Sequence, residues 1–389
     1  MKETGVKARL KAAALGAISV IFRKNRIVFE SNPEFSCNTY PVYRYLVDEK
    51  HIDEKFEIVW LVSDKSKYAD CRRKNHRFLE YSDPGDPAKK KLEYLWTLAT
   101  ARALVYSNRL LGKYSKKQYS IDLMHGMPLK RTQEIYRIDD RCDNVVCTSD
   151  FFADNLVSGF GVAREKLLNV DFARNDFLFT DRDVPAALGV RGFDKILVWM
   201  PTFRQNRVQQ QFDIAGTATG LPLINTGEDL ARLDRRLRET GSLLIVKPHP
   251  AQAKLLADMG TENFRILTNA DLAAADVQTN ELLGCADALI TDYSTVYYDF
   301  LLTGKPIGLT TDDAKEYTDK RGFFYDDPYS VLKGARMENV DALLQFITDV
   351  KNGEDPHADE RRRVCETVHP YYTKNTAARI GDIILNKIL

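Results

Sequence analysis

Residues 288–309, ALITDYSTVYYDFLLTGKPIGL, contain the pattern that decides the fold of this chain. Ala288–Thr291 and Pro306–Leu309 are short apolar runs typical of buried strands, and Thr295–Thr303 between them has the character of a helix. A strand, a helix and a second strand in this order predict two parallel strands joined by a crossover helix. The same alternation extends from this stretch in both directions.

The alternation predicts two α/β domains. Helices are expected at Thr39–Lys50, Lys89–Ala101, Leu230–Thr240 and Asp276–Cys285. Strands are expected at Arg26–Glu30, Phe56–Val62, Ala103–Ser107, Ser120–Met124, Val145–Thr148, Ile196–Met200 and Leu243–Val246. The pattern breaks at Phe179–Gly192, which is rich in Asp and Gly, and then restarts. We therefore predict two doubly wound domains, 25–185 and 186–389, facing a cleft. The last helix, Tyr372–Leu389, either closes the second domain or crosses back to the first.

Composition limits the function. A length of 389 residues fits two domains, and a net charge of +1 gives no reason to expect a nucleic-acid partner. The six cysteines form no CxxC pair, so a structural zinc site is not expected. GxGxxG and GxxxxGK[ST] motifs are absent, and no DxD pair follows a predicted strand. We expect neither a cofactor nor a metal ion.

The N-terminal segment 1–24 is basic and amphipathic. Lys2, Lys7, Arg9 and Lys11 precede the apolar run Ala12–Phe22, and basic residues follow it. The run is shorter than the ~20 residues needed to span a bilayer. Two interpretations stay open at this point: a helix lying on an anionic membrane surface, or a helix packed on its own domain.

Ligands of doubly wound sheets bind at the carboxyl ends of the strands, so the residues that follow each strand are the candidates for a site. His125 and Gly126 follow the strand Ser120–Met124. Histidine suits proton transfer near neutral pH, and glycine permits close approach of a ligand. Lys247 and His249, separated by a proline, follow Leu243–Val246. A rigid cation and imidazole at this place suit a pyrophosphate.

Two further strand ends carry candidates. Arg204 follows Ile196–Met200 closely enough to contact a phosphate. Asp292, Ser294 and Thr295 lie before a predicted helix, where they could cap it or add donors to an anion site. Taken alone, Arg204 is more typical of an ordinary surface arginine, whereas residues 291–295 are equally compatible with a plain N-cap and with an anion site. Arg174-Asn175-Asp176, near the break, is interpreted as a hinge contact.

The ordered set of motifs resembles a known family. HGMPLK (125–130), PTFR (201–204), KPHP (247–250) and TDYST (291–295) are similar to motifs of the CDP-glycerol glycerophosphotransferases of teichoic-acid synthesis. Phe29-Glu30-Ser31 with Asn38, Glu316-Tyr317 and Arg321-Gly322-Phe323 also resemble family segments. The resemblance covers residues 25–385. This sequence departs from the usual pattern at Met127, Ala173 and Leu332-Lys333-Gly334.

The resemblance implies a GT-B-like fold, a CDP-polyol donor and peripheral attachment at the cytoplasmic face of the plasma membrane. The implied reaction moves a polyol phosphate, glycerol phosphate in the first place, to a lipid-linked or polymeric teichoic-acid or capsule acceptor and releases CMP. His125 would be the general base, and His249 would bind the pyrophosphate. Gly126, Arg204, Lys247, Asp292, Ser294 and Thr295 would bind substrate.

Alternatives stay open at this point. A hexosyltransferase of the same fold would use a nucleotide sugar, and a non-catalytic nucleotide-binding protein would bind without turnover. The sequence does not distinguish glycerol from ribitol or another polyol, a primase from a polymerase, one acceptor from another, or one oligomeric state from another.

Overall fold

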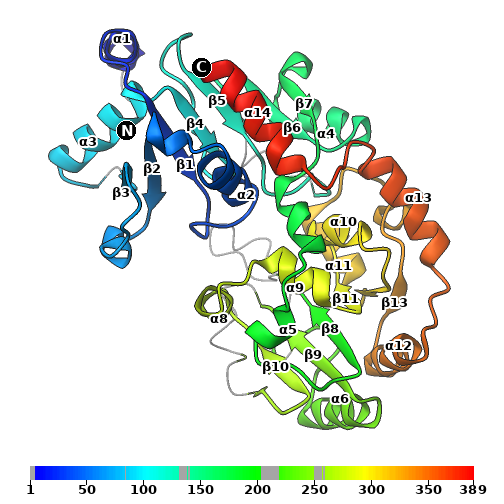
Figure 1. Ribbon diagram of the computed structural model, residues 1–389. Coiled ribbons are helices and arrows are strands. Elements are labelled where there is room, and N and C mark those ends of the chain that lie inside the picture. The colour runs from blue at the N-terminus through cyan, green and yellow to red at the C-terminus, as the bar shows by residue number, and fades with distance from the viewer. Residues whose placement is uncertain are drawn as a thin grey trace. The chain divides into compact units, whose positions relative to one another are not determined.

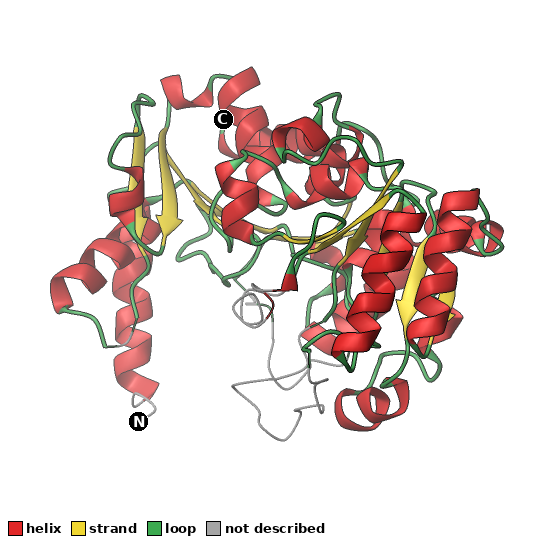
Figure 2. Cartoon of the chain, turned by 90° about the horizontal axis from the view of Figure 1, so that it is seen from below, coloured by secondary structure: helices red, strands yellow, loops and turns green. Residues whose placement is uncertain are grey.

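The structure, a computed structural model, describes residues 5–83, 85–130, 138, 141–202, 219–248, 256 and 259–389. The chain divides into two units, which Figure 1 colours by position in the sequence. The N-terminal unit comprises Met1–His125, Gln133–Asp176 and Tyr371–Leu389. The C-terminal unit comprises Gly126–Thr132 and Phe177–Pro370. Each unit is an α/β structure with helices packed along its strands (Figure 2).

The described residues of the N-terminal unit form a parallel sheet in the order β3-β2-β1-β4-β5-β6-β7. Its strands are β1 (Arg26–Glu30), β2 (Glu57–Val62), β3 (His76–Glu80), β4 (Ala103–Tyr106), β5 (Tyr119–Asp122), β6 (Asn144–Cys147) and β7 (Leu167–Asn169). Its helices are α1 (Gly5–Ile21), α2 (Thr39–Arg44), α3 (Ala88–Thr100), α4 (Asp150–Phe160) and α14 (Thr376–Ile388).

The C-terminal unit repeats this order as β10-β9-β8-β11-β12-β13, again parallel. Its strands are β8 (Lys195–Trp199), β9 (Ser242–Val246), β10 (Phe264–Ile266), β11 (Ala288–Thr291), β12 (Ile307–Thr310) and β13 (Ala335–Met337). Its helices are α5 (Val184–Ala187), α6 (Gly227–Glu239), α8 (Asn269–Ala274), α9 (Thr279–Cys285), α10 (Val296–Leu301), α11 (Ala314–Arg321), α12 (Val340–Asn352) and α13 (Ala358–Val368). The predicted doubly wound α/β class is confirmed for both units.

The sequence predicted the central strands of both sheets but not their edge strands. All nine predicted strands are present within one or two residues of their expected bounds. The four strands that were not predicted, β3, β7, β10 and β13, lie at the sheet edges. Each contains residues that are not buried, whereas β1, β4, β9 and β11 are buried throughout. Edge strands are short and half covered, so they lack the continuous apolar run that identifies a buried parallel strand.

Several predicted helices differ from those observed. The helix expected at Asp276–Cys285 begins at Thr279, and the one expected at Tyr372–Leu389 begins at Thr376. The helix expected at Thr39–Lys50 is α-helical only in α2 and continues as a π-helical turn, Tyr45–Glu49. The helix expected at Thr295–Thr303 is the shorter α10, whose last turn is closed by the Thr303 N–H donating to the Phe300 carbonyl.

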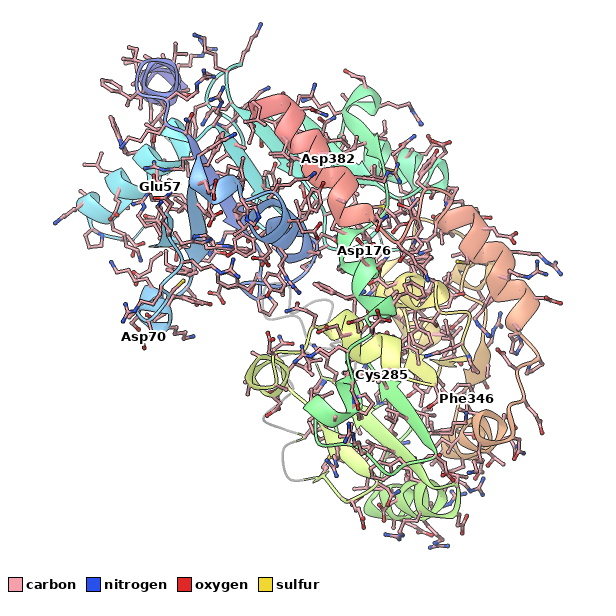
Figure 3. All side chains as sticks on the ribbon, in the orientation of Figure 1. Glu57, Asp70, Asp176, Cys285, Phe346 and Asp382 are labelled. Atoms are coloured by element: carbon pink, nitrogen blue, oxygen red, sulfur yellow. The ribbon has the colours of Figure 1, made fainter. Side chains whose placement is uncertain are left out.

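Helix α14 belongs to the N-terminal unit, although it ends the chain (Figure 1). The Asp176 carboxylate accepts from the backbone N–H groups of Thr376 (3.2 Å) and Ala377 (2.8 Å), at the first turn of α14 (Figure 3). The Tyr45 hydroxyl donates to Asp382 at 2.8 Å. A Cβ on Gly381 would lie 2.3 Å from the Tyr45 ring, so only glycine lets α14 pack this closely.

Helix α1 packs on the N-terminal unit along one side. It contacts α3, and the Ser19 hydroxyl lies 2.8 Å from that of Ser115. The Phe22 and Trp96 rings lie 5.3 Å apart. The interpretation of a helix packed on its own domain is therefore confirmed for this side of α1. Its other side carries exposed apolar side chains.

Candidate functional site

The carboxyl ends of β9, β8 and β11 lie side by side at one edge of the C-terminal sheet, because the three neighbouring strands are parallel. The chain begins this sheet at β8 and then adds strands on either side of it. Such a switch point is where ligands bind in doubly wound sheets. Lys247 follows β9, Thr202 follows β8, and Asp292 follows β11.

Lys247 is a buried cation with a neutral partner. Its side chain is only 8% exposed, and Nζ donates to Oδ1 of Asn269 at 2.7 Å. Burial lowers the pKa of Lys247 to about 8. Within the described part of the chain no carboxylate is paired with this ammonium group. A buried charge is costly unless it is neutralised, so a phosphate at this place would supply the missing counter-charge.

Asp292 holds the turn that follows β8. One of its carboxylate oxygens accepts from the Thr202 backbone N–H at 2.8 Å, and the other accepts from the Thr202 hydroxyl. The Thr291 hydroxyl donates to the Met200 carbonyl at 2.8 Å. These contacts give Asp292 a role in shaping the turn. Direct binding of substrate by Asp292 stays a prediction.

Ser294 and Thr295 lie partly exposed before α10. Thr295 is the N-cap residue, and in this fully described stretch it makes no side-chain cap hydrogen bond. Its backbone angles are helical (φ −67°, ψ −14°), whereas a capping side chain requires an extended residue. Of the three candidate caps, Thr295 therefore does not cap this helix through its side chain. The two hydroxyls stay candidates for phosphate binding.

Gly126 is required by contact with the start of α10. A Cβ at this position would lie 2.5 Å from Thr295 Oγ1 and 3.0 Å from Thr295 Cβ. Real atoms do not pack this closely, so any larger residue would displace the turn. We expected Gly126 to permit the approach of a ligand; the structure shows that Thr295 approaches it.

Residues 126–130 also join the C-terminal unit through Lys130. Lys130 forms an isolated antiparallel bridge with Phe323, and its Nζ lies 5.3 Å from the centre of the Tyr317 ring. The Tyr317 ring in turn lies 4.4 Å from that of Tyr293. Three segments noted in the sequence, 126–130, 291–295 and 316–323, therefore form one cluster.

His125 lies in the N-terminal unit after β5, and its ring orientation is defined. Nδ1 lies 3.2 Å from the Ser107 carbonyl oxygen. A carbonyl can only accept, so Nδ1 carries the proton and Nε2 holds the lone pair. Desolvation by the surrounding protein lowers the pKa of His125, and the nearby Arg174 charge acts in the same direction. His125 is therefore neutral near pH 7 and able to accept a proton at Nε2.

The main chain around His125 is held by two side chains. Asn38 Nδ2 donates to the carbonyls of Leu123 (3.1 Å) and Met124 (2.9 Å). The Arg174 guanidinium donates to the His125 carbonyl at 2.7 Å, and the Arg174 backbone N–H donates to Asn38 Oδ1 at 3.1 Å. Asn38 and Arg174 thus fix the place from which the imidazole projects.

Asp122 stabilises the turn immediately before His125. Met124 has a positive φ of 56°, which is unusual for a residue with a side chain. The Asp122 carboxylate accepts from the Met124 backbone N–H at 2.8 Å and stabilises this conformation. Burial raises the pKa of Asp122 to about 7.

Two predicted site residues, Arg204 and His249, lie outside the described residues. Asn269, which sequence reasoning missed, follows β10 by three residues. The edge strand β10 lacks the continuous apolar run that would identify it in the sequence, so no pattern there marks Asn269 as a residue at a strand end. Among the described residues, no group of three or more His, Cys, Asp or Glu side chains could hold a metal ion.

Comparison with known protein sequences finds similar proteins among the enzymes of teichoic-acid synthesis. The family profile of the CDP-glycerol:poly(glycerophosphate) glycerophosphotransferases matches residues 13–386. A teichoic acid poly(glycerol phosphate) polymerase of Bacillus spizizenii is 25% identical over 386 residues, which cover 90% of each chain. A teichoic acid poly(ribitol-phosphate) polymerase of the same strain is 23% identical, over 85% of this chain and 52% of its own length.

Solved structures show the fold. The wall teichoic acid polymerase TagF has a TM-score of 0.72 at 18% identity and matches 98% of this chain and 95% of its own. A UDP-GlcNAc 2-epimerase of Methanocaldococcus jannaschii has a TM-score of 0.51 at 14% identity, over 93% of this chain and 99% of its own. The predicted GT-B-like α/β fold is confirmed.

Replacing Lys247 by methionine should stabilise the protein at neutral pH. The pKa of Lys247 in the folded state, about 8, lies below its ordinary value of 10.5, so the ionised form opposes folding at pH 7. This cost is present below pH 8 and disappears as pH rises towards ~10.4, the value of an unfolded lysine. Lys247→Met should raise the free energy of urea unfolding by ~1–3 kcal/mol at pH 7 and by little at pH 10.

The matched control is Lys305→Met. Burial lowers the pKa of Lys305 as well, but its Nζ donates to the carbonyls of Gly284 (2.8 Å) and Ala286 (2.6 Å), and methionine would leave both carbonyls without this donor. Its removal should lower stability at pH 7. A Lys247→Met variant that is less stable than the parent at pH 7 would show that Lys247 is a structural lysine.

Proposed function

Because this chain belongs to the CDP-glycerol:poly(glycerophosphate) glycerophosphotransferase family, we propose that it transfers a polyol phosphate, glycerol phosphate in the first place, from a CDP-polyol donor. The acceptor is a hydroxyl group of a lipid-linked or polymeric teichoic-acid or capsule chain, and the leaving product is CMP. The observation that carries the proposal is the buried Lys247 at the switch point of the C-terminal sheet, with its neutral partner.

The donor binds to the C-terminal unit in this proposal. Lys247 contacts the pyrophosphate and neutralises charge that develops on CMP as it leaves. Ser294 and Thr295 add hydroxyl donors to the phosphates. Asp292 keeps the turn after β8 in place through Thr202. Arg204 and His249, which lie outside the described residues, complete the pyrophosphate site.

The acceptor is activated by the N-terminal unit. Nε2 of His125 takes the proton from the acceptor hydroxyl, and the oxygen attacks the β-phosphorus in line. A new phosphorus–oxygen bond forms to the acceptor, and the bond from the β-phosphorus to the bridging oxygen breaks. That oxygen leaves with CMP. Phosphoryl transfer requires mainly positioning and charge stabilisation, which these side chains supply.

The relatives include transferases of both glycerol phosphate and ribitol phosphate. A panel of CDP-glycerol, CDP-ribitol and UDP-glucose with a lipid-linked acceptor extract identifies the donor by the nucleotide released. Release of CMP from only one of the two CDP-polyols would identify the polyol that is transferred. UDP from UDP-glucose would favour a hexosyltransferase, and CDP binding without turnover would favour a non-catalytic protein.

His125→Ala should abolish most of this turnover without loss of donor binding. A general base contributes ~10²–10⁴-fold, so kcat for CMP release should fall by that factor. Calorimetric binding of CDP should be unchanged, because the donor site is assigned to the other unit. His357→Ala is the matched control, since that exposed ring pairs only with Glu360 on α13 among described residues. A His125→Ala variant with nearly full turnover would contradict the assignment.

The proposed location is the membrane surface. No helix in the described part of the chain is long and apolar enough to cross a bilayer. Exposed apolar side chains lie on α1 and α3 or directly after α1, and are here called the α1/α3 patch: Leu10, Val20, Ile21, Phe22, Leu92 and Trp96. Ile21 and Leu92 are 70% and 67% exposed.

Charge favours an anionic lipid surface as the occupant of the α1/α3 patch. Exposed basic residues lie near these side chains in the sequence, on α1 (Arg9, Lys11), directly after it (Arg23, Lys24) and on α3 (Lys89). Glu93 is the one acidic residue in the sequence of the two helices, and it is paired with Arg77 at 3.3 Å. Apolar side chains enter the headgroup region while each nearby Lys or Arg adds about 1 kcal/mol of attraction.

Ile21→Asp should weaken binding to vesicles that contain phosphatidylglycerol. Burial of one large aliphatic side chain contributes ~1.5–3 kcal/mol, so the partition coefficient should fall roughly 10- to 100-fold. Leu389→Asp, an equally exposed apolar position at the end of the chain, should have no effect. Equal binding by Ile21→Asp and the parent protein, or dimerisation through the patch in sedimentation, would contradict the membrane assignment.

A further inference from the structure

Glu30, at the carboxyl end of β1, is a buried carboxylate that the proposed mechanism does not use. Its side chain is fully buried, and Oε2 accepts from three successive backbone N–H groups: Ser107 (3.3 Å), Asn108 (3.0 Å) and Arg109 (3.0 Å). The Tyr81 hydroxyl donates to Oε1 at 3.3 Å. Glu30 therefore determines the shape of the turn that follows β4.

The same turn holds the ring of His125. The N–H of Asn108 and the carbonyl of Ser107 belong to one peptide group. On one side that group donates to Glu30, and on the other its carbonyl accepts from His125 Nδ1 at 3.2 Å. Hydrogen bonds in such a chain polarise one another, so a carboxylate that accepts from the N–H makes the carbonyl a better acceptor.

We propose that Glu30 is a positioning residue for His125, acting through the peptide group between Ser107 and Asn108 to keep Nδ1 protonated and Nε2 as the proton acceptor. The inference rests on the proposed function only where it concerns turnover. The arrangement performs the task of a carboxylate bound directly to an imidazole, with one peptide group inserted between the two.

Neighbouring groups are consistent with this role. Thr39 Oγ1 donates to the Glu30 carbonyl at 2.8 Å and lies 2.6 Å from the Ser107 hydroxyl, so the ends of β1 and β4 are tied together. Burial raises the pKa of Glu30, and the three backbone N–H groups oppose that rise. Among the described residues, Tyr81, Tyr94 and Asp122 interact electrostatically with Glu30, and the Arg174 charge acts on His125.

The decisive variants are Glu30→Gln and Glu30→Ala. Glutamine keeps a carboxamide oxygen that can accept from the same N–H groups but has no charge, whereas alanine removes the acceptor. Glu34→Ala is the matched control. Glu34 is a carboxylate of the same unit that accepts from the Ser63 N–H and hydroxyl, both at 2.7 Å, and has no contact with the Ser107 turn among described residues.

The primary measurement is the ¹⁵N shift of the two His125 ring nitrogens in the full chain, assigned with His125→Asn. The parent, Glu30→Gln and Glu34→Ala should show a protonated Nδ1, and Glu30→Ala should show a mixture of tautomers. In parallel, kcat for CMP release should fall by ~10- to 10²-fold in Glu30→Ala and be largely restored in Glu30→Gln. The KM for the donor should not change.

Two results would overturn the proposal. An unchanged tautomer in Glu30→Ala would show that the Ser107 turn does not need the carboxylate. A loss in Glu30→Gln as large as in Glu30→Ala, with the tautomer intact in both, would show that Glu30 acts in some other way. A tautomer that changes in Glu30→Ala without any change in turnover would support the Glu30–His125 link and contradict only the general-base role of His125. The ring measurement thus separates the two claims.

Discussion

Buried parallel strands constrain the rest of this structure. In β1, β4, β9 and β11 every residue is buried, so the polar groups that do chemistry must lie where the strands end. In each sheet the first strand in the sequence lies in the middle, and later strands are added on either side of it. Within one sheet, the carboxyl ends of neighbouring strands therefore lie side by side. One sheet presents a cation and hydroxyl groups, and the other presents an imidazole with a defined acceptor nitrogen. The proposed division between donor binding by one unit and proton transfer by the other is based on these groups.

The residues of the sequence motifs and of the segments near them have two kinds of role. In the proposed mechanism, Lys247 and His125 carry the groups that act on the substrate. Other motif residues hold them or their turns: Asp292 binds Thr202, Arg174 binds the His125 carbonyl, and Gly126 leaves room for Thr295. Glu30 extends the second class by one step, since it holds the peptide that holds the imidazole. These motifs therefore contain residues that support the local backbone as well as residues proposed to contact the substrate.

Much of the fold and part of the site could be predicted from the sequence. Continuous apolar runs identified the central strands, and searching the strand ends identified His125 and Lys247. The partners of these residues could not be found in this way, because Ser107, Arg174 and Asn269 are distant in sequence and meet them only through tertiary structure. The edge strands were missed for lack of an apolar run. Thr295, one of three candidate caps of α10, does not cap it because its backbone is helical rather than extended.

The most direct test of the central claim is a crystal structure of the His125→Ala variant with CDP-glycerol bound. The account predicts that oxygens of the donor pyrophosphate lie within ~2.7–3.1 Å of Lys247 Nζ, at the switch point of the C-terminal sheet. Ser294 and Thr295 should face the same phosphates. A donor whose phosphates bind elsewhere, with Lys247 still bonded only to Asn269, would contradict the account.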